Sequence, residues 1–151
     1  MKRQHTVSSL EETRRLAETF AQYVQPHMVI TLEGDLGAGK TTFTQFVADA
    51  LEIVEVVNSP TFTIMKSYHS GVLPLHHIDA YRLEGSQEDL GWDEIFTDAA
   101  LVIVEWAQFI EEELPEQRLQ LSIRYVDETT RMIECVPIGE RYETLCQEVF
   151  E

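Results

Sequence analysis

The chain has 151 residues, of which 27 are Asp or Glu and 11 are Lys or Arg, so its formal net charge is -16. This length is typical of one ordinary domain and can bury a core without disulfide or metal cross-links, so we expect a single domain over residues 1–151. The acidity excludes a broad basic face that grips nucleic acid or an anionic membrane, so we expect no DNA partner.

The longest apolar run, residues 99–104, is far shorter than the ~20 residues of a membrane helix. The basic N-terminus is not followed by the apolar stretch of a signal peptide. We therefore expect no membrane partner and a cytoplasmic location.

The first part of the chain predicts a helix, a strand, a loop and a second helix. Ser9 and Glu12 have the spacing of a capping box, and apolar residues recur at helical spacing behind them until Pro26. Residues 28–32 form a β-branched run typical of a buried strand. Residues 34–39 are a glycine-containing loop, and residues 40–51 again show helical spacing.

The rest of the chain predicts a mixed sheet. Residues 54–57 predict a strand, and residues 62–68 and 72–78 predict an antiparallel hairpin around a glycine. One or two helical turns in residues 86–96 precede a doubly covered strand, 101–104, and a short helix, 109–114. Two more strands, 119–125 and 132–136, and a helix, 140–150, complete an α/β fold with a mixed sheet flanked by helices and an antiparallel hairpin portion.

The cysteines and the paired histidines predict no special chemistry. Cys135 lies in a strand-like run and Cys146 in a helix-like run, so we expect two reduced thiols that pack as small apolar groups. Neighbouring residues on a strand face opposite sides, so His76 and His77 cannot chelate one metal together. We expect a packed or hydrogen-bonded histidine, no zinc site and no nucleophile with a nearby base.

Residues 34–41, GDLGAGKT, match the P-loop pattern G-x-x-x-x-G-K-[ST]. Glycines let the backbone wrap around a phosphate, and the N-terminus of the following helix attracts the anion. Lys40 can reach the β- and γ-phosphates, and the Thr41 hydroxyl can bind Mg²⁺. The predicted strand before the loop and the predicted helix after it are the context that a P-loop NTPase-like fold requires.

A P-loop site also needs an acid at the end of a neighbouring strand. Glu105 directly follows the apolar strand 101–104, and we favour it as the acid on the metal side. Asp79, at the end of the predicted hairpin, is the second candidate. Either carboxylate can hold Mg²⁺ through water or polarise an attacking water.

Four sequence blocks stand out along the chain: GDLGAGKTTF at residues 34–43, SPTFT at 59–63, HIDAYRL at 77–83 and VEW at 104–106. As a set, the blocks resemble the TsaE family of bacterial tRNA threonylcarbamoyladenosine biosynthesis proteins, over about residues 9–136. The resemblance implies a small ATPase that uses ATP and Mg²⁺ and works with the proteins TsaB and TsaD. That system modifies adenosine 37 of tRNA, so this chain would meet tRNA only through the complex.

Carried over to this sequence, the resemblance assigns roles to single residues. Lys40, Thr61, Asp79 and Glu105 would act in catalysis, and Thr41 and Glu105 would hold Mg²⁺. The residues implied to contact ATP are Asp35, Leu36, Gly37, Ala38, Gly39, Lys40, Thr41, Thr42, Trp106 and Arg131. Within these sets, the resemblance places Thr61 on a switch-like loop near the γ-phosphate and Arg131 near the adenine.

Three other functions fit a P-loop. A small-molecule kinase usually clamps its substrates with several arginines on a lid, but residues 107–117 contain no arginine. A nucleotide-binding adaptor that does not hydrolyse is disfavoured by the intact Lys40, Thr41 and Glu105. A GTPase is disfavoured because no lysine of the chain lies in a guanine-reading N-K-x-D pattern.

Overall fold

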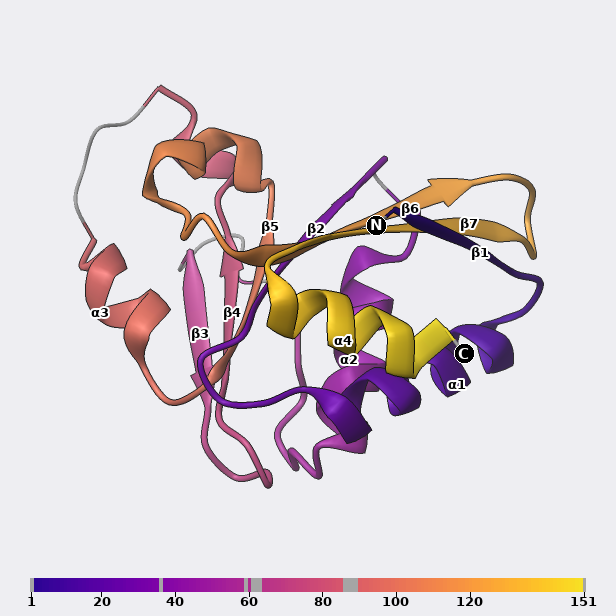
Figure 1. Ribbon diagram of the computed structural model, residues 1–151, viewed down its shortest axis with the longest axis horizontal. Coiled ribbons are helices and arrows are strands. Elements are labelled where there is room, and N and C mark those ends of the chain that lie inside the picture. Colours follow the sequence, from indigo (N-terminus) through magenta and orange to yellow (C-terminus); the bar gives the residue numbers. More distant parts are fainter. Residues whose placement is uncertain (1, 36, 59, 61–63, 86–89, 151) are drawn as a thin grey trace.

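The structure is a computed structural model that describes residues 2–35, 37–58, 60, 64–85 and 90–150 (Figure 1). The described strands form one seven-stranded sheet in the order β1-β7-β6-β2-β5-β4-β3. The strands are β1 (Arg3–Val7), β2 (Val29–Gly34), β3 (Met65–Tyr68), β4 (Leu75–Asp79), β5 (Leu101–Glu105), β6 (Arg118–Tyr125) and β7 (Arg131–Ile138). The helices are α1 (Leu10–Tyr23), α2 (Lys40–Ala50), α3 (Trp92–Thr97) and α4 (Glu140–Phe150), with 3₁₀ helices η1 (Tyr81–Leu83) and η2 (Ala107–Glu113).

The centre of the sheet is parallel and its flanks are antiparallel. Strand β2 runs parallel to β5 and β6, and β5 runs parallel to β4. Strands β3, β7 and β1 each pair antiparallel with their neighbour. The predicted α/β fold, a P-loop NTPase-like mixed sheet with a hairpin portion, is confirmed.

Each face of the sheet packs against its own hydrophobic core. Helices α1, α2 and α4 lie together on one face, whereas α3 and the 3₁₀ helices cover the other (Figure 1). Strand β5 serves both cores, because Leu101 and Ile103 point to the first face and Val102 and Val104 to the second. This double burial explains the unbroken apolar run in the sequence.

The predicted start of the first helix is correct. The Ser9 side chain accepts a hydrogen bond from the Glu12 amide at 3.1 Å, and Glu12 accepts one from the Ser8 amide at 2.9 Å. These bonds satisfy amides that the helix itself leaves without partners. Helix α1 therefore begins at Leu10 and turns its apolar side to α2 and α4.

Several predicted elements differ in the structure. Residues 54–57 are not a strand: the Val54 amide donates to the Ser70 hydroxyl, and Val54 and Val56 lie exposed, away from the sheet edge that β3 occupies. Strand β1 was not predicted, because its polar residues carry no apolar pattern and pair only as an edge strand. The short helix predicted at 109–114 is the 3₁₀ helix η2, interrupted at Ile110. In the predicted helical region 86–96, residues 86–89 lie outside the described residues.

The prediction of two separate thiols is wrong. Cys135 on β7 and Cys146 on α4 are both buried, and the structure joins them as a disulfide between strand and helix. The fold brings the two sulfur atoms together because α4 packs back on the face to which Cys135 points. Their separation by 11 residues did not indicate that contact.

No helix in the described part of the chain combines the length and the apolar character needed to cross a membrane.

Candidate functional site

The P-loop connects the end of β2 to the start of α2. Gly37 and Gly39 have φ values of 80° and 111°, a left-handed conformation that side chains rarely adopt. Gly34 is constrained differently, because a Cβ there would lie 2.3 Å from the Ile123 carbonyl oxygen of β6. The glycine requirement seen in the sequence thus has two local causes. Leu36 lies outside the described residues.

Lys40 is a buried cation at the beginning of α2, with 7% of its surface exposed. Its Nζ donates a hydrogen bond to the Gly34 carbonyl at 3.0 Å and lies 4.3 Å from the centre of the Trp106 ring. A buried ammonium group needs such partners, and a carbonyl dipole and an aromatic face are weaker ones than a carboxylate. Within the described part of the chain, Nζ makes no ion pair.

The two predicted acids lie side by side at the carboxyl ends of parallel strands. Asp79 of β4 pairs in register with Glu105 of β5, and Glu105 with Leu32 of β2. Both carboxylates are buried, with relative exposures of 6% and 3%, and strand alternation turns them to the face that α2 covers. Asp79 accepts a hydrogen bond from the Tyr81 amide at 3.0 Å.

His77 makes a short polar contact with Glu105. Its Nε2 lies 2.6 Å from Oε2 of Glu105, and both side chains are almost fully buried. The sequence indicated only that one of the two neighbouring histidines is packed or hydrogen-bonded. His77 lies two residues before Asp79 on β4 and so shares its face, but the acid that it contacts lies on β5, and no local spacing indicates that pairing.

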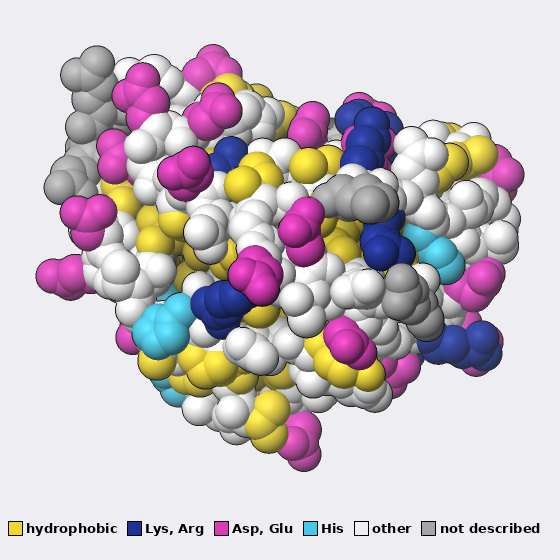
Figure 2. All heavy atoms as spheres, viewed as in Figure 1, with side chains coloured by type: hydrophobic (Ala, Val, Ile, Leu, Met, Phe, Trp, Pro, Cys, Tyr) yellow, Lys and Arg dark blue, Asp and Glu magenta, His cyan; other side chains and the backbone are white. Residues whose placement is uncertain are grey.

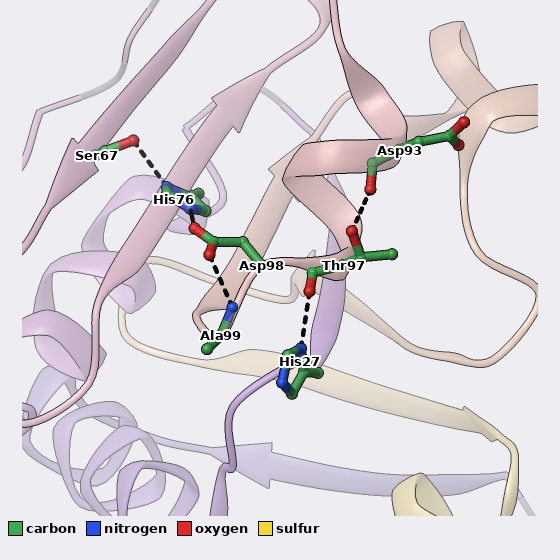
Figure 3. A network of polar contacts seen from close by, with 7 residues as sticks. All are labelled: His27, Ser67, His76, Asp93, Thr97, Asp98 and Ala99. Atoms are coloured by element: carbon green, nitrogen blue, oxygen red, sulfur yellow. Dashed lines mark hydrogen bonds and ion pairs between the residues drawn. The ribbon is translucent and has the colours of Figure 1, made fainter.

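His76 points to the opposite face, as predicted for neighbours on a strand. Its Nδ1 lies 2.7 Å from the Ser67 hydroxyl and its Nε2 lies 2.8 Å from the Asp98 carboxylate (Figure 3). The hydrogen bond from His76, together with one from the Ala99 amide, holds the pKa of Asp98 below its usual value. This Ser–His–Asp row, which sequence analysis missed, lies toward the amino ends of the parallel strands, away from the P-loop.

A pocket of about 380 Å³ opens beside the P-loop. Its lining comes from the loop, the start of α1 and the β6–β7 hairpin: Ser9, Leu10, Thr13, Gly37, Ala38, Gly39, Thr42, Ile123, Glu128, Thr129, Arg131 and Ile133. Arg131 donates from Nε to the Ala38 carbonyl at 3.0 Å, and its guanidinium lies over the Tyr125 ring. No local pattern marks the α1 residues, because only the packing of α1 on α2 brings them to this pocket.

Trp106, which was predicted to contact the nucleotide, directly follows Glu105 at the end of β5. It follows β5 with a left-handed backbone, φ 59°, and its ring contacts Lys40, Tyr81 and Phe109. The structure thus brings Lys40, Asp79, Glu105 and Trp106 together at the carboxyl ends of the parallel strands. It places Arg131 against the backbone of the P-loop. Thr61, together with the neighbouring Ser59, lies outside the described residues.

This set of groups suits a magnesium–phosphate ligand better than a metal alone. Thr41 and the two acids offer oxygen ligands, which Mg²⁺ prefers. The described residues contain no group of three His, Cys, Asp or Glu side chains able to hold a metal. Mg²⁺ commonly binds through one or two carboxylates plus substrate phosphates and water, and the residues present fit that mode.

The mixed sheet flanked by helices, with the P-loop at the carboxyl end of the parallel strand β2, defines an α/β protein of the P-loop NTPase-like class. The family model for the threonylcarbamoyl adenosine biosynthesis protein TsaE matches residues 7–133. The chain belongs to the TsaE family.

Relatives and a solved structure agree with this assignment. The chain is 52% identical over 139 residues to the tRNA threonylcarbamoyladenosine biosynthesis protein TsaE of Bacillus subtilis, covering 92% of this chain and 88% of that protein. It is 39% identical to the protein of that name from Streptomyces coelicolor, covering 87% and 94%. The crystal structure of Bacillus subtilis YdiB superposes with a TM-score of 0.87 at 43% identity, covering 99% of this chain and 95% of that one.

Proposed function

We propose that this protein is the ATP-binding and ATP-hydrolysing subunit of the tRNA threonylcarbamoyladenosine machinery and acts in the cytoplasm with TsaB and TsaD. Its membership of the TsaE family supports the role in threonylcarbamoyladenosine biosynthesis. The observation that carries the ATPase proposal is the buried Lys40 at the mouth of a P-loop, on the sheet edge that also bears Asp79 and Glu105.

The geometry supports a division of roles among these residues. Lys40 binds the β- and γ-phosphates, exchanging the Gly34 carbonyl and the Trp106 ring for stronger anionic partners. Amides of residues 37–41 donate to phosphate oxygens at the start of α2. The pocket beside the P-loop, where Arg131 contacts Ala38, takes the nucleoside.

Thr41 and Glu105 hold Mg²⁺, which neutralises charge on the β- and γ-phosphates when bound. Asp79, beside Glu105, orients or polarises the attacking water. Thr61, on the switch-like loop, senses the γ-phosphate in this proposal.

Hydrolysis by the protein alone is expected to be slow. In the described residues near the P-loop, the guanidinium of Arg131 is committed to the Ala38 carbonyl and to its own turn. A group supplied by a partner to stabilise the developing phosphate charge can raise such rates by about 10³–10⁵. Acidic side chains are spread over the face seen in Figure 2, and the net charge of -16 suits docking to a basic surface of a partner that itself holds the tRNA.

The test combines ATPase rates and pull-down with TsaB and TsaD under ADP, ATP and a non-hydrolysable analogue. We expect slow turnover alone, faster turnover with the partners and binding that depends on the nucleotide. If the nucleotide alters neither docking nor rate, and tRNA modification runs through many turnovers without this protein, the proposal is wrong. Nucleotide-dependent docking without hydrolysis would instead identify an adaptor.

A further inference from the structure

His77 and Glu105 form a buried polar pair on the face of the sheet that the first core covers. The His77 side chain is 0% exposed and the Glu105 side chain is 4% exposed, and both lie on the face of the sheet that the first core covers. Burying a carboxylate and an imidazole is costly, and apolar side chains of similar volume often serve stability as well or better. Stability alone therefore gives no reason for this pair on the adjacent parallel strands β4 and β5.

The two ring nitrogens of His77 are used unequally. Nε2 lies 2.6 Å from Oε2 of Glu105, whereas Nδ1 is buried and has no hydrogen-bond partner among the residues that the structure describes. The neighbouring His76 uses both nitrogens, one for Ser67 and one for Asp98. His76 therefore ties three segments together, but the whole polar contact of His77 is directed at one carboxylate.

That contact fixes how Glu105 can act. With Nε2–H donating to Oε2, rotation of the carboxylate breaks a short buried hydrogen bond, so its orientation is held before any ligand arrives. Oε1 is then the oxygen left for a metal ion or its bound water. A carboxylate that binds a metal is commonly held in this way by a second residue.

We propose that His77 is a positioning residue that orients Glu105 for the magnesium ion of the bound nucleotide. The inference rests on the proposed function, in which Glu105 is on the metal side of the site. It assigns His77 no contact with the nucleotide, so nucleotide binding without metal should not depend on it.

The experiment compares the Mg²⁺ dependence of ADP binding, measured by calorimetry, in wild type and four variants. His77→Gln keeps an amide donor close to the place of Nε2. His77→Asn is too short to reach Glu105, and His77→Phe fills the ring's space without a donor. His76→Gln is the matched control, since it changes the neighbouring histidine on the other face.

We expect His77→Asn and His77→Phe to raise the Mg²⁺ concentration needed for half-maximal enhancement of ADP affinity by about 10–100-fold. Affinity measured in EDTA should stay at the wild-type value. His77→Gln should restore most of the metal dependence, and His76→Gln should leave it unchanged. Melting temperatures of the free proteins, recorded in parallel, identify a variant that is merely unfolded. If His77→Asn is unfolded, His77→Phe is the variant that tests the loss of the donor.

Three results overturn the inference in distinguishable ways. If wild type binds ADP with strong Mg²⁺ dependence and folded His77→Phe does so equally, His77 does not position Glu105 and the proposed function stands. If wild type shows no nucleotide binding at all, the proposed function fails and the inference fails with it. Equal loss in His77→Gln and His77→Phe would also contradict a role that depends on the donor.

Discussion

The two ends of the parallel strands are built differently. At the carboxyl ends, Lys40 and Glu105 are buried charged groups with few partners, namely a carbonyl, an aromatic ring and one histidine. At the amino ends, polar groups are matched more fully: His76 bonds to Ser67 and Asp98 (Figure 3). Buried groups with incomplete partners carry a cost that a ligand can remove. We infer that the first end is organised for binding and the second for stability.

The largest expected effect is that of Lys40→Ala. Removing the ammonium group deletes a charge-assisted contact to phosphate of about 1.5–3 kcal/mol, so ATP affinity should fall at least tenfold. Hydrolysis should fall by about a further 10²–10³-fold, because charge on the transferring phosphate is no longer stabilised. Calorimetry and ATPase assays measure both effects, with the exposed Lys66→Ala as control. Equal ATP affinity in Lys40→Ala and wild type would contradict the inference that the carboxyl ends of the parallel strands are organised for binding.

Glu105→Gln should separate activity from stability. Gln is nearly isosteric and still accepts a hydrogen bond from His77, so the melting temperature should stay close to that of wild type. Hydrolysis should fall by about 10²-fold, because a neutral amide is a weaker ligand for Mg²⁺ than a carboxylate. The exposed Glu112→Gln serves as control for the loss of one negative charge. A large loss of stability with full activity would place Glu105 among structural residues.

At the amino ends of the strands, Tyr142→Phe should lower stability and leave ATP binding unchanged. The Tyr142 hydroxyl of α4 accepts a hydrogen bond from the buried Val29 amide at 2.8 Å, at the start of β2. Without that acceptor the amide is left unsatisfied, and the free energy of unfolding should drop by about 1–3 kcal/mol. Urea denaturation measures the loss, with Tyr23→Phe as a matched exposed control. We expect unchanged ATP affinity. A drop in affinity would contradict the inference that the amino ends of the strands serve stability and not binding.

The smallest effect is the pH dependence contributed by Asp98. Its pKa is lowered in the folded protein by the hydrogen bond from His76, so its contribution to stability is complete above the unfolded pKa of about 4. That contribution is lost as the pH falls through the lower folded pKa. Asp98→Asn should therefore be slightly less stable than wild type near neutrality and equal to it in strong acid. Unfolding curves across this pH range provide the measurement, and a pH-independent difference would contradict the assignment.

Elements with a strong local pattern could be predicted from the sequence. The capping box at Ser9, the doubly buried strand β5 and the glycines before Lys40 each have a local physical cause. Residues 54–57 were predicted wrongly because their β-branched residues suggest a strand, while β3 already occupies the sheet edge. Strand β1 was missed because an edge strand with polar residues has no pattern to detect.

By itself, the sequence determined the P-loop, the candidate acids Asp79 and Glu105 and the α/β class, since these depend on residue types at short spacing. Only the tertiary structure decided which side chains meet across strands and helices. It joined His77 to Glu105, Arg131 to Ala38 and Cys135 to Cys146, and it brought the start of α1 to the pocket. The physical reason is that strand register and helix packing set these contacts, and neither leaves a mark in the local spacing of residues.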